Sequence, residues 1–329
     1  MFSVTDGPAE GQPFYPLEWH TFVVGSLFGW LTSSGRWRFR HAWLETGKGQ
    51  AKSPLMGAIG LYVMGWCGIP RAQVFAIGQD KATAGVLFRD SVAMCRGQIP
   101  DEEEGDTLER RGEVIIRGEG DNAWMVEHPS SQSFFRKLAG GDAQSGPRPA
   151  CVLADEIHEF KSDHSIETWR RAIDKIAGNA MMILGTNTPA TNQHVGQSYS
   201  SMYQLIAKGE KRDDSAFAFI ARIDKADRET VFENEACWKK SLPALGETFP
   251  IENIRETVAG AVLRPSTKSS VKRLYFGIDV GAADFWMDEE KFKAVTIRNR
   301  PGINTKQRIV WNGVALDIKT APPSARTAR

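Results

Sequence analysis

The sequence predicts an α/β fold in which helices cover both faces of a doubly wound, mostly parallel sheet. Two observations carry this prediction. Short apolar runs typical of buried strands alternate with segments whose apolar spacing is typical of helices. Two polar clusters, residues 47–53 and 155–156, each follow such a run. Because ligands of open α/β sheets bind beyond the carboxyl ends of the strands, we expect both clusters at one edge of the sheet.

The expected elements follow one another along the chain. Apolar and aromatic runs bounded by polar or glycine-rich segments predict strands at 38–44, 73–78, 114–117, 151–154, 181–184 and 216–223. Helices are expected after Ser53, from Asp80 as N-cap toward Cys95, and at 169–176, 197–208 and 251–259. The intervening segments predict an exposed charged insertion at 100–120, a loop at 140–149 and a linker at 265–270.

One apolar stretch has the length of a membrane span. The 18 residues between Lys52 and Arg71 carry no charge, which is close to the lower limit of about 18 for a transmembrane helix. Two prolines and four glycines shorten its usable apolar length. We therefore expect a buried helix and no membrane partner.

Charge is distributed unevenly. The chain has 41 basic and 40 acidic side chains, a net charge of +1 that excludes a uniformly basic DNA-coating protein. Residues 291–329 hold nine basic side chains and one acidic one, so residues 1–290 carry a net charge of −7. The basic tail is the expected nucleic-acid contact if it is native.

Residues 47–53 have the order of a phosphate-binding loop, which ends in Lys and Ser or Thr at a helix start. The candidate nucleotide-binding residues are Gly47, Lys48, Gly49, Gln50, Ala51, Lys52 and Ser53. Lys52 is expected to meet the β- and γ-phosphates of ATP, and Ser53 to ligate Mg²⁺. Ala51 replaces the motif's second glycine, so the loop must tolerate a left-handed alanine or bend differently. A solvated glycine–lysine turn is the alternative.

Asp155 and Glu156 end an apolar strand and are the natural partners of this loop. Asp155 is expected to hold Mg²⁺, directly or through Ser53, and Glu156 to polarise the attacking water. A solvated acidic turn is the alternative. The neighbouring acids and histidines up to His164 could instead hold a metal, which makes a metallohydrolase the rival hypothesis, although no H-E-x-x-H helix is present.

Thr186 and Asn187 follow the next strand, in the segment Gly185-Thr186-Asn187-Thr188. Polar residues there can contact the γ-phosphate or its water and report hydrolysis to a moving part. A capped turn before Pro189 is the alternative.

The order of these motifs resembles the large terminase subunit of tailed bacteriophages. The similarity covers roughly residues 14–290. The matching segments are Phe28-Gly29-Trp30, Arg38-Phe39-Arg40, 48–54, 73–94, 155–159, 185–188, Trp238, 242–246, Pro265-Ser266 and Phe285-Trp286-Met287.

The resemblance implies an ASCE-type P-loop ATPase that uses ATP and Mg²⁺ to drive double-stranded DNA into procapsids. Lys52, Glu156, Thr186 and Asn187 would be the catalytic and coupling residues. It further implies a homo-oligomeric ring, small-subunit and portal partners, and a place in the host cytoplasm. Lys48 stands where the family has a basic residue, and His20 where it often has Gln. The candidates for an arginine supplied by a neighbouring subunit are Arg136, Arg170 and Arg171.

The expected domains are an ATPase domain at 1–225, a linker or helical region at 226–290 and a basic tail at 291–329. The family's ribonuclease H-like nuclease begins with an apolar-Gly-apolar-Asp strand, which two segments imitate. We interpret 276–279 as linker or a short strand, and 314–317 as the better candidate. Twelve residues follow Asp317, so we expect the nuclease to be missing or reduced to its first strand.

Two alternatives to an active motor stay open. One is a non-catalytic nucleotide-binding remnant of a truncated prophage gene. The other is a metal-dependent nuclease centred on Asp279 and Asp284.

Overall fold

The computed structural model describes residue 4 and residues 10–99, 102–139 and 146–279, together with strands at 308–311 and 314–317. The chain divides into two compact units, residues 1–283 and residues 284–329. The first unit contains both polar clusters.

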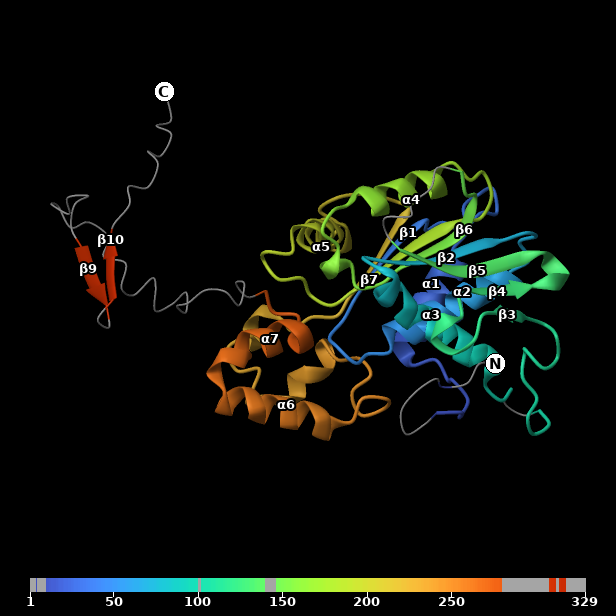
Figure 1. Ribbon diagram of the computed structural model, residues 1–329. Coiled ribbons are helices and arrows are strands. Elements are labelled where there is room, and N and C mark those ends of the chain that lie inside the picture. The colour runs from blue at the N-terminus through green and yellow to red at the C-terminus, as the bar shows by residue number, and fades with distance from the viewer. Residues whose placement is uncertain are drawn as a thin grey trace, which may run out of the picture. The chain divides into compact units, whose positions relative to one another are not determined.

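An eight-stranded sheet forms the centre of the first unit, in the order β3-β4-β5-β2-β6-β7-β1-β8 (Figure 1). The strands from β5 to β8 run parallel, and β3 and β4 are antiparallel to their neighbours. Their bounds are β1 His41–Glu45, β2 Gln73–Gly78, β3 Ile115–Arg117, β4 Met125–His128, β5 Ser133–Ala139, β6 Pro149–Ala154, β7 Met181–Thr186 and β8 Ala216–Ile220. Because β7 lies between β1 and β6, the two polar clusters flank the end of a third strand.

Helices cover both faces of this sheet, which confirms the predicted fold class (Figure 1). One face carries α1 (Glu18–Gly29), α2 (Lys52–Gly65) and α3 (Lys81–Arg96), and the other α4 (His164–Asp174) and α5 (His194–Ala207). Asp80 caps α3 as predicted, because its carboxylate accepts a hydrogen bond from the amide of Thr83.

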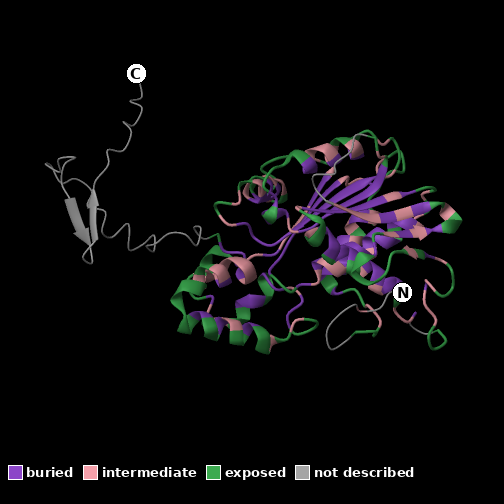
Figure 2. Ribbon diagram, in the orientation of Figure 1, coloured by how far each residue is buried: buried purple, intermediate pink, exposed green. Residues whose placement is uncertain are grey.

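The side chains of each strand alternate between the two faces of the sheet, so that one core lies on each face. The central strands are mainly buried (Figure 2). In β1, Ala42 and Leu44 pack toward α1–α3, whereas Trp43 packs toward α5, where its ring stacks on Tyr203 at 5.3 Å. All five residues of β1 are buried, as expected for a parallel strand covered on both faces.

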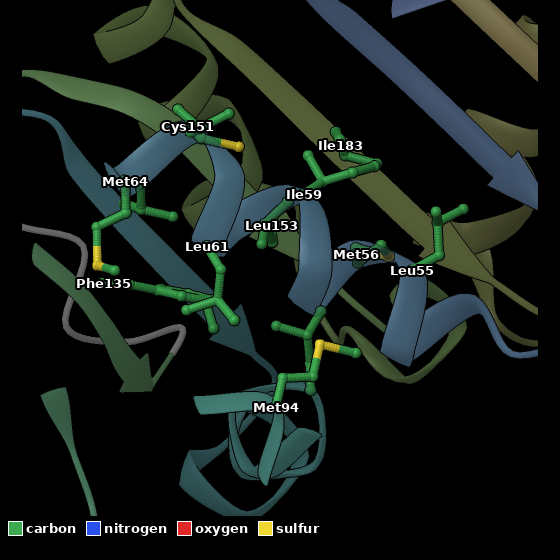
Figure 3. Packing of buried hydrophobic residues seen from close by; sticks show 14 of the residues in the cluster. Leu55, Met56, Ile59, Leu61, Met64, Met94, Phe135, Cys151, Leu153 and Ile183 are labelled. Carbon is green, nitrogen blue, oxygen red and sulfur yellow. The ribbon is translucent and has the colours of Figure 1, made fainter. Parts of the chain in front are cut away.

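The uncharged stretch after Lys52 is the buried helix α2, as predicted. Its apolar side chains meet Phe135, Cys151, Leu153 and Ile183 of the sheet (Figure 3). Gly60 is the point of closest approach, since a Cβ there would lie 2.7 Å from Phe135 and 2.8 Å from Leu153. None of the helices described is long and apolar enough to cross a membrane.

Residues 223–278 form a smaller third core beside the carboxyl edge of the sheet. Two helices, α6 (Ile251–Leu263) and α7 (Lys268–Phe276), enclose buried Trp238, Ile254 and Phe276. The linker predicted at 265–270 is wrong: a 3-10 turn occupies 265–267, and α7 begins at Lys268. Residues 276–279 are not a strand either, since Gly277, with φ +66°, ends α7.

The second unit contains one described feature, an antiparallel pair of β9 (Arg308–Trp311) and β10 (Val314–Asp317). The apolar-Gly-apolar-Asp candidate at 314–317 therefore is a strand. Phe285-Trp286-Met287, Asp284 and most of the basic tail lie outside the described residues.

Several element bounds differ from those predicted. Helix α4 begins at His164 and ends at Asp174, and β8 ends at Ile220. Among the α-helices and strands that the structure describes, five were not predicted: α1, α7, β4, β5 and β9. The described part of the charged segment 100–120 is mainly exposed, as expected.

Candidate functional site

The loop between β1 and α2 has the backbone geometry of a tight turn into a helix. Gly49 has φ +79°, and Ala51, the N-cap of α2, has φ 56° and ψ 35°. The chain therefore accepts a left-handed alanine where the motif has glycine. A β-carbon in this region is disfavoured by about 1–2 kcal/mol, so the surrounding contacts must hold the loop in place.

Lys52 lies at the first turn of α2 and is 7% exposed. Its Nζ donates to Asn187 Oδ1 at 2.8 Å, Thr46 Oγ1 at 3.2 Å and the Gly47 carbonyl at 3.4 Å. Burial lowers the pKa of Lys52, and the carboxylates of Glu156 and Asp155 oppose that shift. A cation held beside a glycine-rich loop at a helix start is suited to meet phosphate.

Ser53 and Asp155 meet across the gap between α2 and β6. Ser53 Oγ donates to Asp155 Oδ2 at 2.5 Å, and the carboxylate is buried. A hydroxyl and a carboxylate are the hard oxygen donors that Mg²⁺ prefers, so this pair fits the predicted metal position.

Glu156 follows Asp155 in a strained conformation, with φ 53° and ψ 47°. Its Oε2 lies 3.1 Å from His158 Nδ1 and accepts from Asn187 Nδ2 at 3.4 Å. Burial, reinforced by Asp155, raises the pKa of Glu156 to about 7. A carboxylate of that basicity is suited to accept a proton from water near neutral pH.

His158 is a neutral neighbour of Glu156. Burial lowers its pKa to about 4, and the positive charges of Arg273 and Lys52 act in the same direction. Its amide donates to Thr186 Oγ1 at 3.2 Å, and Thr186 in turn donates to the Asn187 carbonyl at 2.7 Å. The residues after β6 and those after β7 are thus hydrogen-bonded to each other.

Glu45, the last residue of β1, is fully buried and anchors the far side of the site. Thr188 Oγ1 donates to its carboxylate at 3.0 Å, and Arg222 Nε donates at 2.8 Å. Arg222 also pairs with Asp279 at 2.9 Å. Trp43 and Ser200 complete the shell around Glu45. This buried ion pair links the phosphate-loop strand to the segment after β8.

The smaller third core packs against the phosphate loop. The amide of Gly47 donates to the Ser241 carbonyl at 3.1 Å, and the Gln50 side chain accepts from the amide of Ala244 at 2.7 Å. A Cβ on Gly47 would lie 2.5 Å from the Tyr275 carbonyl, which explains the glycine there. The side chain of Gln50 therefore shapes the loop, while Lys48 is exposed.

The remaining candidates are placed as follows. His20 is fully buried. Burial lowers its pKa to about 4, and the backbone of Ala51 and Gln50 acts on the pKa in the opposite direction. Arg136 covers the rings of Phe75 and Phe134 with its guanidinium. Of the other two arginines, Arg170 is half-buried and pairs with Glu167 at 3.7 Å, whereas Arg171 is exposed.

The acidic and histidine side chains of residues 155–164 do not come together as a metal cluster. In the part of the chain that the structure describes, no three His, Cys, Asp or Glu side chains are arranged to hold a metal ion. His164 instead begins α4. Asp279, the centre of the nuclease alternative, has both oxygens engaged by Arg222.

The fold is that of a P-loop NTPase, and the two motif loops meet at its carboxyl edge. The chain belongs to the terminase large subunit family, because the model described as "Terminase large subunit, ATPase domain" matches residues 18–204. A second model, "Terminase large subunit, endonuclease domain", matches residues 210–321. That match includes much of the region predicted as linker and tail. No curated protein matches the chain.

The solved structure of a phage large terminase shares the fold. The large terminase of bacteriophage HK97 is 17% identical with a TM-score of 0.67, and the match covers 84% of this chain and 53% of that one. The ATPase domain of the Thermus phage P74-26 large terminase is 14% identical with a TM-score of 0.46, over 80% and 98% of the two chains. The chain thus spans about half the length of the HK97 protein.

Sequence reasoning missed four residues of the site: Glu45, His158, Arg222 and Arg273. A buried acid directly before a phosphate loop was the available signal for Glu45. No sequence signal indicated Arg222 or Arg273, because each reaches the site from a segment distant in sequence.

Proposed function

We propose that this chain hydrolyses ATP with Mg²⁺ and couples hydrolysis to translocation of double-stranded DNA. The observation that carries the proposal is the convergence of Lys52, Ser53, Asp155, Glu156 and Asn187 at one sheet edge, joined by the hydrogen bonds described above. Family membership supports the same reading.

Each residue has a distinct part in this proposal. The amides of residues 49–53 and the Lys52 ammonium bind the phosphates, whereas the amides of Gly47 and Lys48 donate to the carbonyls of Ser241 and Leu274. Ser53 and Asp155 would hold Mg²⁺, which when bound neutralises charge on the transferred phosphoryl group. Glu156 accepts the proton of the attacking water. Thr186 and Asn187 transmit the structural change that follows hydrolysis to the rest of the chain.

The partners proposed are those of a packaging motor. Double-stranded DNA is the substrate that is moved, a homo-oligomeric ring is the working form, and a small terminase subunit and a portal protein are the contacts. A bacterial host cytoplasm is the proposed location.

The test is ATP turnover by the purified full chain, with Mg²⁺ and linear double-stranded DNA. Lys52→Ala should lower the rate about 100-fold or more, because it removes the cation that meets the phosphates. Glu156→Gln should retain ATP binding and lose turnover to a similar extent. Matched controls are Lys208→Ala and Glu210→Gln, both at exposed positions, which should leave the rate unchanged.

Equal rates in Lys52→Ala and the unaltered protein would contradict the proposal. ATP binding without any turnover would instead identify the non-catalytic remnant.

A nuclease is a second candidate because the endonuclease-domain model matches residues 210–321. The ion pair with Arg222 argues against Asp279 as its centre, whereas Asp317 ends β10. Plasmid cleavage lost in Asp317→Asn and retained in Asp279→Asn would support a nuclease centred on β10.

A further inference from the structure

The carboxyl-terminal end of α7 lies between the phosphate loop and the loop that follows β7. The Leu274 carbonyl accepts from the amide of Lys48 at 2.8 Å. One residue earlier, Arg273 donates from a terminal guanidinium nitrogen to the Thr188 carbonyl, also at 2.8 Å. Two consecutive residues of α7 therefore contact both loops that form the candidate nucleotide site.

Arg273 is a partly buried cation with little to neutralise it. Among the residues that the structure describes, its guanidinium makes this hydrogen bond and no ion pair. Burial lowers the pKa of Arg273, and its charge contributes to the lowered pKa of His158. Keeping an unpaired guanidinium partly buried costs free energy, so its position calls for a functional reason.

Thr188 is held from two sides. Its hydroxyl donates to Glu45, and its carbonyl accepts from Arg273. The preceding residue, Asn187, contacts both Lys52 and Glu156. A shift of the Thr188 backbone would therefore move the amide that joins the phosphate-binding cation to the carboxylate.

We infer that Arg273 is a positioning residue of the nucleotide site. By holding the Thr188 carbonyl it fixes the loop that presents Asn187, so that ATP turnover depends on the docking of α7 against the phosphate loop. The inference rests on the proposed function, since it concerns the rate of the same reaction.

The test compares Arg273→Ala and Arg273→Lys with the unaltered full chain. Arg273→Ala should lower kcat for ATP about tenfold or more, the size expected for losing one charge-assisted hydrogen bond, and change KM less than about twofold. Arg273→Lys should recover most of the rate, because an ammonium can also donate to the carbonyl. The matched control is Arg255→Ala on α6, whose arginine pairs with Glu235 at the surface and should leave kcat unchanged.

Chemical rescue separates positioning from folding. Millimolar guanidinium should raise the rate of Arg273→Ala toward that of the unaltered protein and leave Lys52→Ala inactive. Two results would overturn the inference while the proposed function stands. One is an unchanged kcat in Arg273→Ala; the other is a reduced kcat that is restored neither by guanidinium nor in the Arg273→Lys variant. Absence of both turnover and fluorescent-ATP binding in the unaltered protein would overturn the two together.

Discussion

Lys52 Nζ donates to Asn187 Oδ1 at 2.8 Å, so the first turn of α2 is joined directly to the loop after β7. The same amide donates to Glu156 at 3.4 Å through its nitrogen. One side chain thus contacts the cation of the phosphate loop and the candidate base. A change in the charge of Lys52 or of Glu156 therefore alters the hydrogen bonding of Asn187, and through Asn187 it affects the other residue.

Replacing Asn187 should therefore affect turnover more than binding. We expect Asn187→Ala to lower kcat about 10- to 100-fold, because Glu156 and Lys52 lose their common partner, with the Kd for ATP changing less than about threefold. Steady-state ATPase assays and fluorescent-nucleotide titration measure the two quantities. Asn192→Ala, at an exposed position in the same loop, is the control and should behave like the unaltered protein. A loss of binding with unchanged kcat would refute this assignment.

Glu156 should make stability depend on pH with a definite sign. Its pKa is raised to about 7 in the folded chain from 4.5, so the folded state binds its proton more tightly than the unfolded state. The contribution of Glu156 is therefore lost as pH rises from about 4.5 to 7. Glu156→Gln, which resembles the protonated acid, should match the unaltered protein at pH 4.5 and be more stable at pH 8.

Urea denaturation at the two pH values checks this expectation. Glu210→Gln, at an exposed position away from Glu156, should show no such difference between them. Equal stability of Glu156→Gln and the unaltered chain at pH 8 would show that the carboxyl is not held in an unfavourable environment.

Ala51 offers a test of backbone strain. Ala51→Gly relieves a left-handed β-carbon but adds freedom to the unfolded chain, so the free energy of unfolding should rise or stay level within about 1 kcal/mol. Ala58→Gly, inside α2, should lower it by about 1 kcal/mol. Thermal unfolding followed by circular dichroism compares them. Equal destabilisation by the two substitutions would mean that position 51 is not strained.

Removing only one partner of the Glu45–Arg222 ion pair should lower the free energy of unfolding. Glu45 is fully buried and the Arg222 side chain is 10% exposed. Arg222→Met leaves an unpaired buried carboxylate and should lower the free energy of unfolding by about 3–5 kcal/mol, and adding Glu45→Leu should recover part of it. Denaturant titration provides both values. Arg255→Met, which removes a surface ion pair, should change stability little. A double variant no more stable than Arg222→Met would argue against an unpaired charge as the cause.

The parts of the fold that were predicted correctly are those in which local pattern and chain order carry the information. A buried strand followed by a polar cluster indicated β1, β6 and β7, and parallel pairing then placed their ends together. Helix α7 was missed because Pro265 and Ser266 resemble a linker, whereas buried Val271 and Phe276 hold the helix through tertiary packing. The shell of Glu45 was not predictable, because its partners Thr188 and Arg222 lie 143 and 177 residues away. The roles assigned to the site residues stay predictions.

The contacts between the phosphate loop and the third core also set an order for biosynthesis. Gln50 and its partner Ala244 are 194 residues apart, and Lys48 meets Leu274 later still. At about 5–20 residues per second, roughly 10–40 s separate the translation of the first pair. During that interval the residues of the phosphate loop have been synthesised, but the residues of the third core that contact the loop have not. The candidate nucleotide site of a ribosome-bound chain is therefore complete only after α7 has been synthesised.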